Sequence, residues 1–358
     1  MITTMEEYEK YRYKKLETDF LTATGNYMGK NFARIRDICL NNWQMMLGDA
    51  VKVQNEAKIP CGYMSISLLN TSIMVGKPQL QTDFYNEDWV YGEPWARGRM
   101  TAEFLFTEWD GFCAAALDGD FYMRSKVPTA AIKAMFWGTV DKLTYLFACY
   151  AKYFVLRLVE LPEFTALTKE PTMYVTCGTY LDWQERLYGV LPEIDLTDLS
   201  DNEATAFREF HGKTYNQAAF TQLDLRHCRF CDCTFEDSIF SEVDLGDAYF
   251  RNCRFRDTNF VQTRVAGSIW ENCRIYDCLW QSTGTQSAAG DDEYFAEAEM
   301  VNTRVNNFRA INCDLSEFML TDCRMTEISL IGCTTENSAW KNYEGGGEYG
   351  NDRVVQTF

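Results

Sequence analysis

Residues 219–260 decide the fold of the last third of the chain, through the runs AFTQLDLRHCRFCDCTFEDSIF (219–240) and DLGDAYFRNCRFRDTNF (244–260). Every fifth residue is large and apolar from Phe220 to Trp280 without a miss, and a mostly small residue lies two positions before each. A period of five matches neither the helical period of about 3.6 nor the strand period of about 2. It predicts a chain that turns a corner every five residues, so that four sides close a square coil of about 20 residues.

The same phase resumes after a break, from Met300 to Trp340. The two quoted runs resemble the A-(D/N)-L-x-x signature of pentapeptide-repeat proteins. The resemblance implies an all-β, right-handed quadrilateral β-helix, which is a pentapeptide-repeat solenoid. It says little about function, because one fold hosts many activities.

The expected organisation has four parts. An α+β domain of unrecognised family covers residues 1–190, and an acidic linker or cap covers 191–214. The β-helix follows over 215–341 with an insertion at 281–297, and a glycine-rich tail covers 342–358.

Apolar spacing in the first half predicts helices over 32–46 and 132–154. Alternation of apolar and polar residues predicts strands at 64–68 and 80–84, with a further strand at 174–180. A helical segment is expected from Pro94 to Leu117.

The cysteines follow the five-residue register. Nine of the 14 lie in the repeats, and all but Cys231 occupy the small inward position. If residues 20 apart stack, one column contains Cys233, Cys253, Cys273, Cys313 and Cys333. Disulfides or a metal are the functional alternatives, but stacked Cβ atoms about 4.8 Å apart are too distant for a disulfide. We interpret these thiols as small apolar filler in the core.

The segment from His227 to Cys233, HCRFCDC, has the composition of a metal knuckle. In this register Cys228 and Cys233 face inward on adjacent sides, whereas His227 and Cys231 lie near a corner. Zinc needs four converging ligands. We therefore predict no metal site and no cofactor.

The break QSTGTQSAAGDDEYFAE (281–297) is interpreted as a deformed coil or a projecting loop, and we leave open whether it is functional or a tolerated insertion. It displays four acidic residues, Asp291, Asp292, Glu293 and Glu297. Loops on rigid scaffolds often carry function.

The net charge of the chain disfavours two classes of function, nucleic-acid binding and binding to anionic membranes. The chain has a formal net charge of −18, which disfavours direct contact with nucleic acid or anionic membranes. Residues 220–340 contain ten arginines, no lysine and 20 acidic residues. Some acidic members of the resembled family imitate B-form DNA and bind DNA gyrase, which is one hypothesis here. Against it, the 20-residue register places Arg264, Arg304 and Arg324 in one outward column and Arg254 with Arg274 in another.

The most consistent function is a non-catalytic scaffold that binds another protein through the β-helix and its acidic loop. Arg264, Arg304, Arg324 and the four acidic loop residues are the candidate contacts. A DNA mimic that binds a type II topoisomerase is the alternative, and an enzyme with its site in the first half is the second. No catalytic constellation is recognised. The N-terminus lacks a signal-peptide pattern, so we expect a cytoplasmic protein without membrane contact; a homo-oligomer stays open.

Overall fold

A five-stranded mixed sheet organises the first unit, Met1–Tyr188. Its strand order is β3-β2-β1-β4-β5, with β1 antiparallel to β2 and parallel to β4. The expected strands at 64–68, 80–84 and 174–180 are confirmed. The bounds are β1 (Cys61–Leu68), β2 (Gln79–Tyr85), β3 (Ala96–Thr101), β4 (Lys169–Thr179) and β5 (Gln184–Val190).

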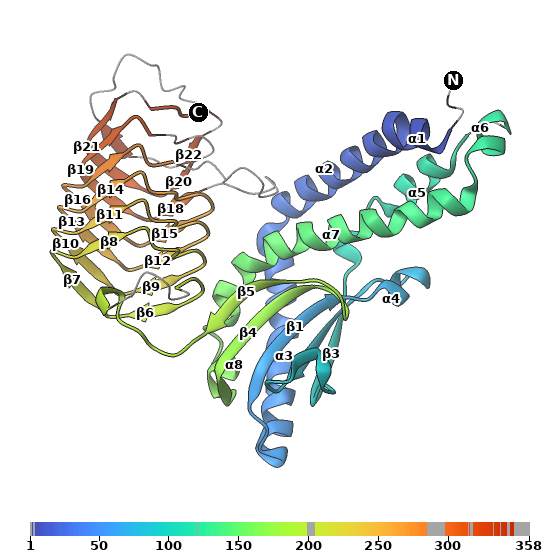
Figure 1. Cartoon of the computed structure of the whole chain (residues 1–358), viewed down its shortest axis with the longest axis horizontal. Helices are drawn as coiled ribbons and strands as arrows, with labels where there is room; N and C mark the ends of the chain where they lie inside the picture. The colour runs from blue at the N-terminus through green and yellow to red at the C-terminus, as the bar shows by residue number, and fades with distance from the viewer. Residues whose placement is uncertain are drawn as a thin grey trace. The chain divides into compact units, whose positions relative to one another are not determined.

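Long helices pack on this sheet and on one another. The expected helices are confirmed as α3 (Phe32–Ala57) and α7 (Thr129–Leu158), which bury Trp43 and Phe147. In Figure 1, α2 runs beside α7. The remaining helices are α1 (Met5–Tyr8), η1 (Glu9–Tyr13), α2 (Lys14–Lys30), α4 (Asn70–Met74), η2 (Trp89–Tyr91), η3 (Glu103–Leu105), α5 (Trp109–Leu117), α6 (Phe121–Lys126) and α8 (Pro162–Ala166). Among the described residues, no helix has both the length and the apolar character needed to span a membrane.

The expected helix from Pro94 to Leu117 is wrong in its first part. Residues 96–101 form β3, which pairs antiparallel with β2. Met100 is buried while Arg97 and Arg99 are exposed, so this segment has the two-residue period of a strand. Within the rest of the range, Glu103–Leu105 forms the short 3₁₀ helix η3 and Trp109–Leu117 forms α5.

The computed structural model describes residues 2, 4–119, 121–198, 205–284, 298–313, 315, 318–331, 333–336, 338–341 and 344–346. In the second unit, Gly189–Phe358, short parallel strands stack into a β-solenoid (Figure 1). A 3₁₀ turn, η4 (Leu196–Asp198), precedes the first coil. That coil already begins at Glu209, because Glu209–His211 pairs with Arg229–Cys231. The β-helix therefore starts inside the segment that the sequence assigned to a cap.

Each face of the coil is a column of strands. The first face contains β6 (Glu209–His211), β9 (Arg229–Cys231), β12 (Tyr249–Arg251), β15 (Ile269–Glu271), β18 (Glu299–Val301), β20 (Met319–Thr321) and β22 (Ala339–Lys341). The second contains β7 (Thr214–Asn216), β10 (Thr234–Glu236), β13 (Arg254–Arg256), β16 (Arg274–Tyr276), β19 (Arg304–Ile311), β21 (Arg324–Ile331) and β23 (Glu344–Gly346). The third contains β8 (Ala219–Thr221), β11 (Ile239–Ser241), β14 (Asn259–Val261) and β17 (Leu279–Gln281), and continues into β19 and β21. The fourth is a row of bridges that joins Asp224, Asp244, Arg264 and Gly284.

The corners explain why the chain turns every five residues. The residue two positions after each large apolar residue adopts positive φ, as Asp232 (57°), Asn252 (55°) and Asn272 (55°) do. Asn and Asp tolerate this left-handed conformation better than other residues with a side chain. Aromatic rings stack inside the coil, and the ring centroids of Phe235 and Phe255 lie 4.9 Å apart. The corners and these buried stacks together produce the square coil.

The inward cysteines are core filler, as expected. The Sγ of Cys233 donates to the carbonyl of Phe210, 23 residues earlier, at 3.3 Å. Thr258 makes the equivalent bond to Phe235 at 3.1 Å, so short side chains with a weak or strong donor fit this position. Burial raises the pKa of Cys228 to about 12, which keeps its thiol protonated and unreactive.

The column of five cysteines is wrong. Across the break, residues 30 apart stack rather than 20, because Trp270 pairs with Met300 and Trp280 with Ala310. Thr303 follows Cys273 in its column, and the Thr303 hydroxyl donates to Trp270, 33 residues earlier. Cys313 belongs to a different face, where its thiol donates to Trp280. The coil that includes the break contains ten residues more than a regular coil. Because ten is a multiple of five, the five-residue pattern continues after the break, but each later residue lies two faces away from the face that a 20-residue spacing predicts.

Candidate interaction surface

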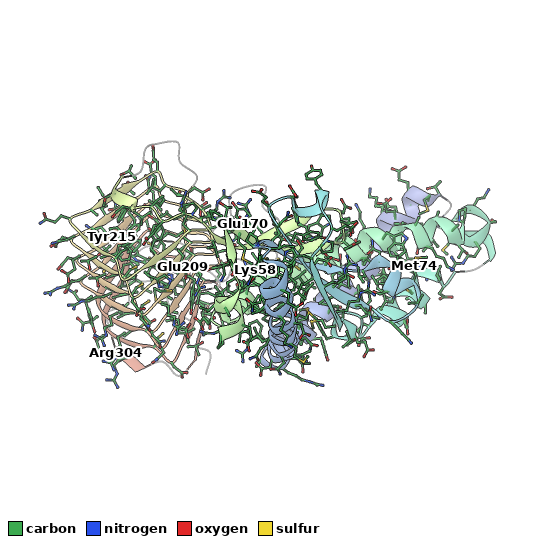
Figure 2. The ribbon with its side chains drawn as sticks, turned by 90° about the horizontal axis from the view of Figure 1, so that it is seen from below. Lys58, Met74, Glu170, Glu209, Tyr215 and Arg304 are labelled. Carbon is green, nitrogen blue, oxygen red and sulfur yellow. The ribbon has the colours of Figure 1, made fainter. Side chains whose placement is uncertain are left out.

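Four arginines stack in consecutive coils on the second face, and we call Arg254, Arg274, Arg304 and Arg324 the arginine column. Arg254 is paired in the backbone register with Arg274, Arg274 with Arg304, and Arg304 with Arg324. Arg254 is half-buried and the other three are exposed. Figure 2 shows Arg304 at the outer edge of the β-helix, with its side chain extending away from the ribbon.

The predicted grouping of Arg264 with Arg304 and Arg324 is wrong for the same reason as the cysteine column. Arg264 lies on the fourth face, where it is bridged to Asp244 and Gly284. Its Nη1 lies 2.9 Å from Oδ2 of Asp244, so its charge is compensated within the β-helix. The sequence placed Arg254 beside Arg274 correctly, but it missed that Arg304 and Arg324 continue their column.

Three asparagines and one aspartate border the arginine column. Asn252, Asn272, Asn302 and Asp322 each lie two residues before a column arginine, at the left-handed corner position. The side-chain amide of Asn302 donates to Oδ1 of Asn272 at 2.7 Å, and that of Asn252 donates to Asp232 at 3.0 Å. Beside the first three column arginines this edge presents amides, which together with the guanidinium groups suit carboxylate oxygens. The fourth, Arg324, follows Asp322 instead.

Carboxylates lie toward the opposite edge of the second face. Arg256, two residues after Arg254, has its Nε 3.6 Å from Asp257. Asp277 accepts a hydrogen bond of 2.8 Å from the side chain of Asn307. The positive charge of the face is therefore confined to one narrow column.

The acidic candidates Asp291, Asp292, Glu293 and Glu297 lie outside the described residues. The nearest described neighbours are Gly284, bridged to Arg264, and Ala298, which is buried in the core.

The knuckle residues do not form one group. Cys228 and Cys233 donate inward to Thr205 and Phe210, on different sides of the coil. His227 stacks on Phe207 at 4.3 Å between ring centroids. Cys231 instead lies near Glu209 and His211, a grouping that sequence reasoning missed. The signal was present, because His211 and Cys231 are 20 residues apart and therefore stack.

The first unit contains a cavity of about 410 Å³, lined in part by Lys77, Arg97 and Arg99. Asp83, at 1% exposure, accepts a hydrogen bond of 2.5 Å from Nε of Arg97. This bond raises the pKa of the Arg97 guanidinium. Nε of Arg99 donates to Gln81 at 2.8 Å.

The comparisons with known proteins concern the repeats. A family model described as pentapeptide repeat region matches residues 208–284. No curated protein is significantly similar to the chain.

The structural matches share little sequence with this chain. A trypsin-treated form of QnrB1, a plasmid-mediated fluoroquinolone resistance protein, is 16% identical; the match covers 41% of this chain and 90% of QnrB1, with a TM-score of 0.24. A pentapeptide repeat protein from the cyanobacterium Cyanothece 51142 is 13% identical over 38% of this chain and 87% of its own, with a TM-score of 0.14. HetL from Nostoc sp. strain PCC 7120, involved in heterocyst differentiation regulation, is 14% identical over 40% and 90%, with a TM-score of 0.12. The stacked coils and the family model agree, and residues 208–284 of this chain are a pentapeptide repeat region.

Proposed function

We propose that this protein is a non-catalytic interaction protein whose β-helix binds a carboxylate-rich segment of a partner protein along the arginine column. The observation that carries the proposal is the stacking of Arg254, Arg274, Arg304 and Arg324 in adjacent coils. Like charges directly opposite one another on neighbouring strands are destabilising. Residues that break a local rule at a cost to stability are expected at functional sites.

The chemistry of the column favours carboxylates. A guanidinium binds a carboxylate through two parallel hydrogen bonds, and the bordering asparagines add amide donors. An extended acidic segment that lies along the coil axis would meet the four arginines in turn.

The overall charge favours a protein over nucleic acid as the partner. Residues 220–340 have twice as many acidic residues as arginines, so a long polyphosphate would be repelled outside the column. The column also argues against the DNA-mimic alternative, because four stacked cations interrupt an imitation of the phosphate backbone. Asp291, Asp292, Glu293 and Glu297 remain a proposed second contact region.

The test compares the double variant Arg274→Gln/Arg304→Gln with the matched control Arg256→Gln on the same face. A fluorescent octaglutamate peptide and a pull-down from the native host supply two readouts. Each lost surface ion pair contributes about 0.2–1 kcal/mol, so the double variant should bind the peptide about 2- to 30-fold more weakly. It should also lose the partner that wild type and Arg256→Gln retain.

Equal binding by wild type and the double variant would rule out the arginine column as the site. Inhibition of DNA gyrase supercoiling by micromolar protein, unchanged in the double variant, would favour the DNA mimic instead.

A further inference from the structure

Three side chains of ligand type converge on the first face of the β-helix, away from the arginine column. They are Glu209 and His211 of β6 and Cys231 of β9, and one ligand atom from each lies within 4.8 Å of the others. Glu209 is half-buried, His211 is exposed and Cys231 is buried. Nε2 of His211 lies 2.8 Å from Oε1 of Glu209.

The coil register produces this convergence. Glu209 and His211 are two residues apart on one strand, so both point outward from the same face. His211 is paired with Cys231 in the next coil. Cys231 is the repeat cysteine that does not occupy an inward position, and His211 is one of only two histidines in the chain.

We infer that Glu209, His211 and Cys231 form a binding site for a divalent zinc-type cation. Thiolate, imidazole and carboxylate are the three ligand types that zinc uses in proteins. Bonds of about 2.0–2.3 Å in a tetrahedron place ligand atoms about 3.3–3.8 Å apart. The cluster reaches this spacing with shifts of about 1 Å, which the exposed His211 side chain can make. A water molecule takes the fourth position.

Arg229 sets a limit on the affinity. Its Nη1 lies 3.6 Å from Oε1 of Glu209, and its guanidinium lies 5.5 Å from the ring centroid of Tyr249. This charge opposes a cation, so the site should bind zinc more weakly than a site with four cysteines.

Binding would join the first coil to the second. β6 is the last strand of its sheet and pairs only with β9 among the described strands. A metal bound by residues of both strands would stabilise this terminal coil, which has a neighbouring coil on one side only.

The experiment uses the full chain, stripped of metal by a chelator and then titrated with Zn²⁺ and with Co²⁺. Wild type should bind about one ion per chain, and the Co²⁺ form should show the sulfur-to-cobalt charge-transfer band in the near ultraviolet. Cys231→Ser should abolish this band, and His211→Gln should weaken zinc binding at least tenfold. The matched control His227→Gln removes the other histidine and should bind zinc as wild type does.

The absence of a charge-transfer band in wild type would overturn the site, as would equal zinc affinity of wild type and His211→Gln. Circular dichroism of each metal-free variant establishes that it folds, and the exposed position of His211 makes its variant the decisive one.

Discussion

Replacing Arg274 by Gln should stabilise the β-helix, because Arg274 lies between two column neighbours, Arg254 and Arg304. At the strand spacing of about 4.8 Å, two unit charges in water repel by about 0.9 kcal/mol. A Debye length of about 8 Å at physiological salt reduces this to about 0.5 kcal/mol. Removing both repulsions, with Arg254 and with Arg304, therefore predicts an increase of about 1 kcal/mol in the free energy of unfolding. This value is an upper one, because the arginine side chains can move apart.

Thermal and urea unfolding at two salt concentrations measure this gain. For a unit of this size, about 1 kcal/mol corresponds to a rise in Tm of about 2–4 °C. In about 1 M salt the Debye length falls to about 3 Å, and the gain should fall to about 0.3 kcal/mol.

Arg256→Gln is the control, because Arg256 is stacked between Glu236 and Tyr276 and lies beside Asp257. Its removal should leave stability unchanged or slightly lower. The reasoning would be refuted if Arg274→Gln were neutral or destabilising at low salt, or if both variants gained equally. Either result would mean that Arg254, Arg274 and Arg304 do not interact as stacked charges.

Three further predictions concern the coil. Phe255→Ala should cost about 3–5 kcal/mol of unfolding free energy, because Phe255 is fully buried with its ring centroid 5.0 Å from that of Trp270. Ile331→Ala, at a position 45% exposed, should stay within about 0.5 kcal/mol in the same denaturant titration. Asn272→Ala should cost about 1–2 kcal/mol more than Asn272→Gly, because φ is 55° there; equal melting of the two variants would contradict a left-handed corner. Deletion of residues 288–297 should keep cooperative unfolding, because it restores across the break the 20-residue spacing between stacked positions that the other coils have. Non-cooperative unfolding of the deletion variant would count against the 30-residue offset.

The first half shows where sequence patterns lose information. The strand at 96–101 has polar residues at Arg97 and Arg99 and a glycine between them, so its apolar alternation is too weak to signal a strand. Pairing with β2 supplies the backbone hydrogen bonds that make it one. Likewise, the hydrogen bond of the buried Asp83 with Arg97 joins β2 to β3, a contact across strands that no local pattern records.

The candidate metal site follows a spacing that is visible in the sequence, because His211 and Cys231 are 20 residues apart and stack in adjacent coils. Sequence patterns did not mark it, because Glu209 and His211 precede the apolar repeats and Cys231 does not occupy an inward position. His227 is nearer to Cys231 in sequence than His211 is, but it lies at the corner before β9 and stacks on Phe207 instead.

The sequence by itself determined the coil: which residues face inward, why the cysteines are core filler, and that the chain turns a corner every five residues. Burial and corner conformation repeat every five residues, and both are local to one coil. Only the tertiary structure decided which coil stacks on which beyond residue 284. An insertion of ten residues preserves a period of five but moves the chain by two faces of a square. The pairing of Arg274 with Arg304, and so the arginine column itself, depends on backbone hydrogen bonds between coils rather than on any pattern within them.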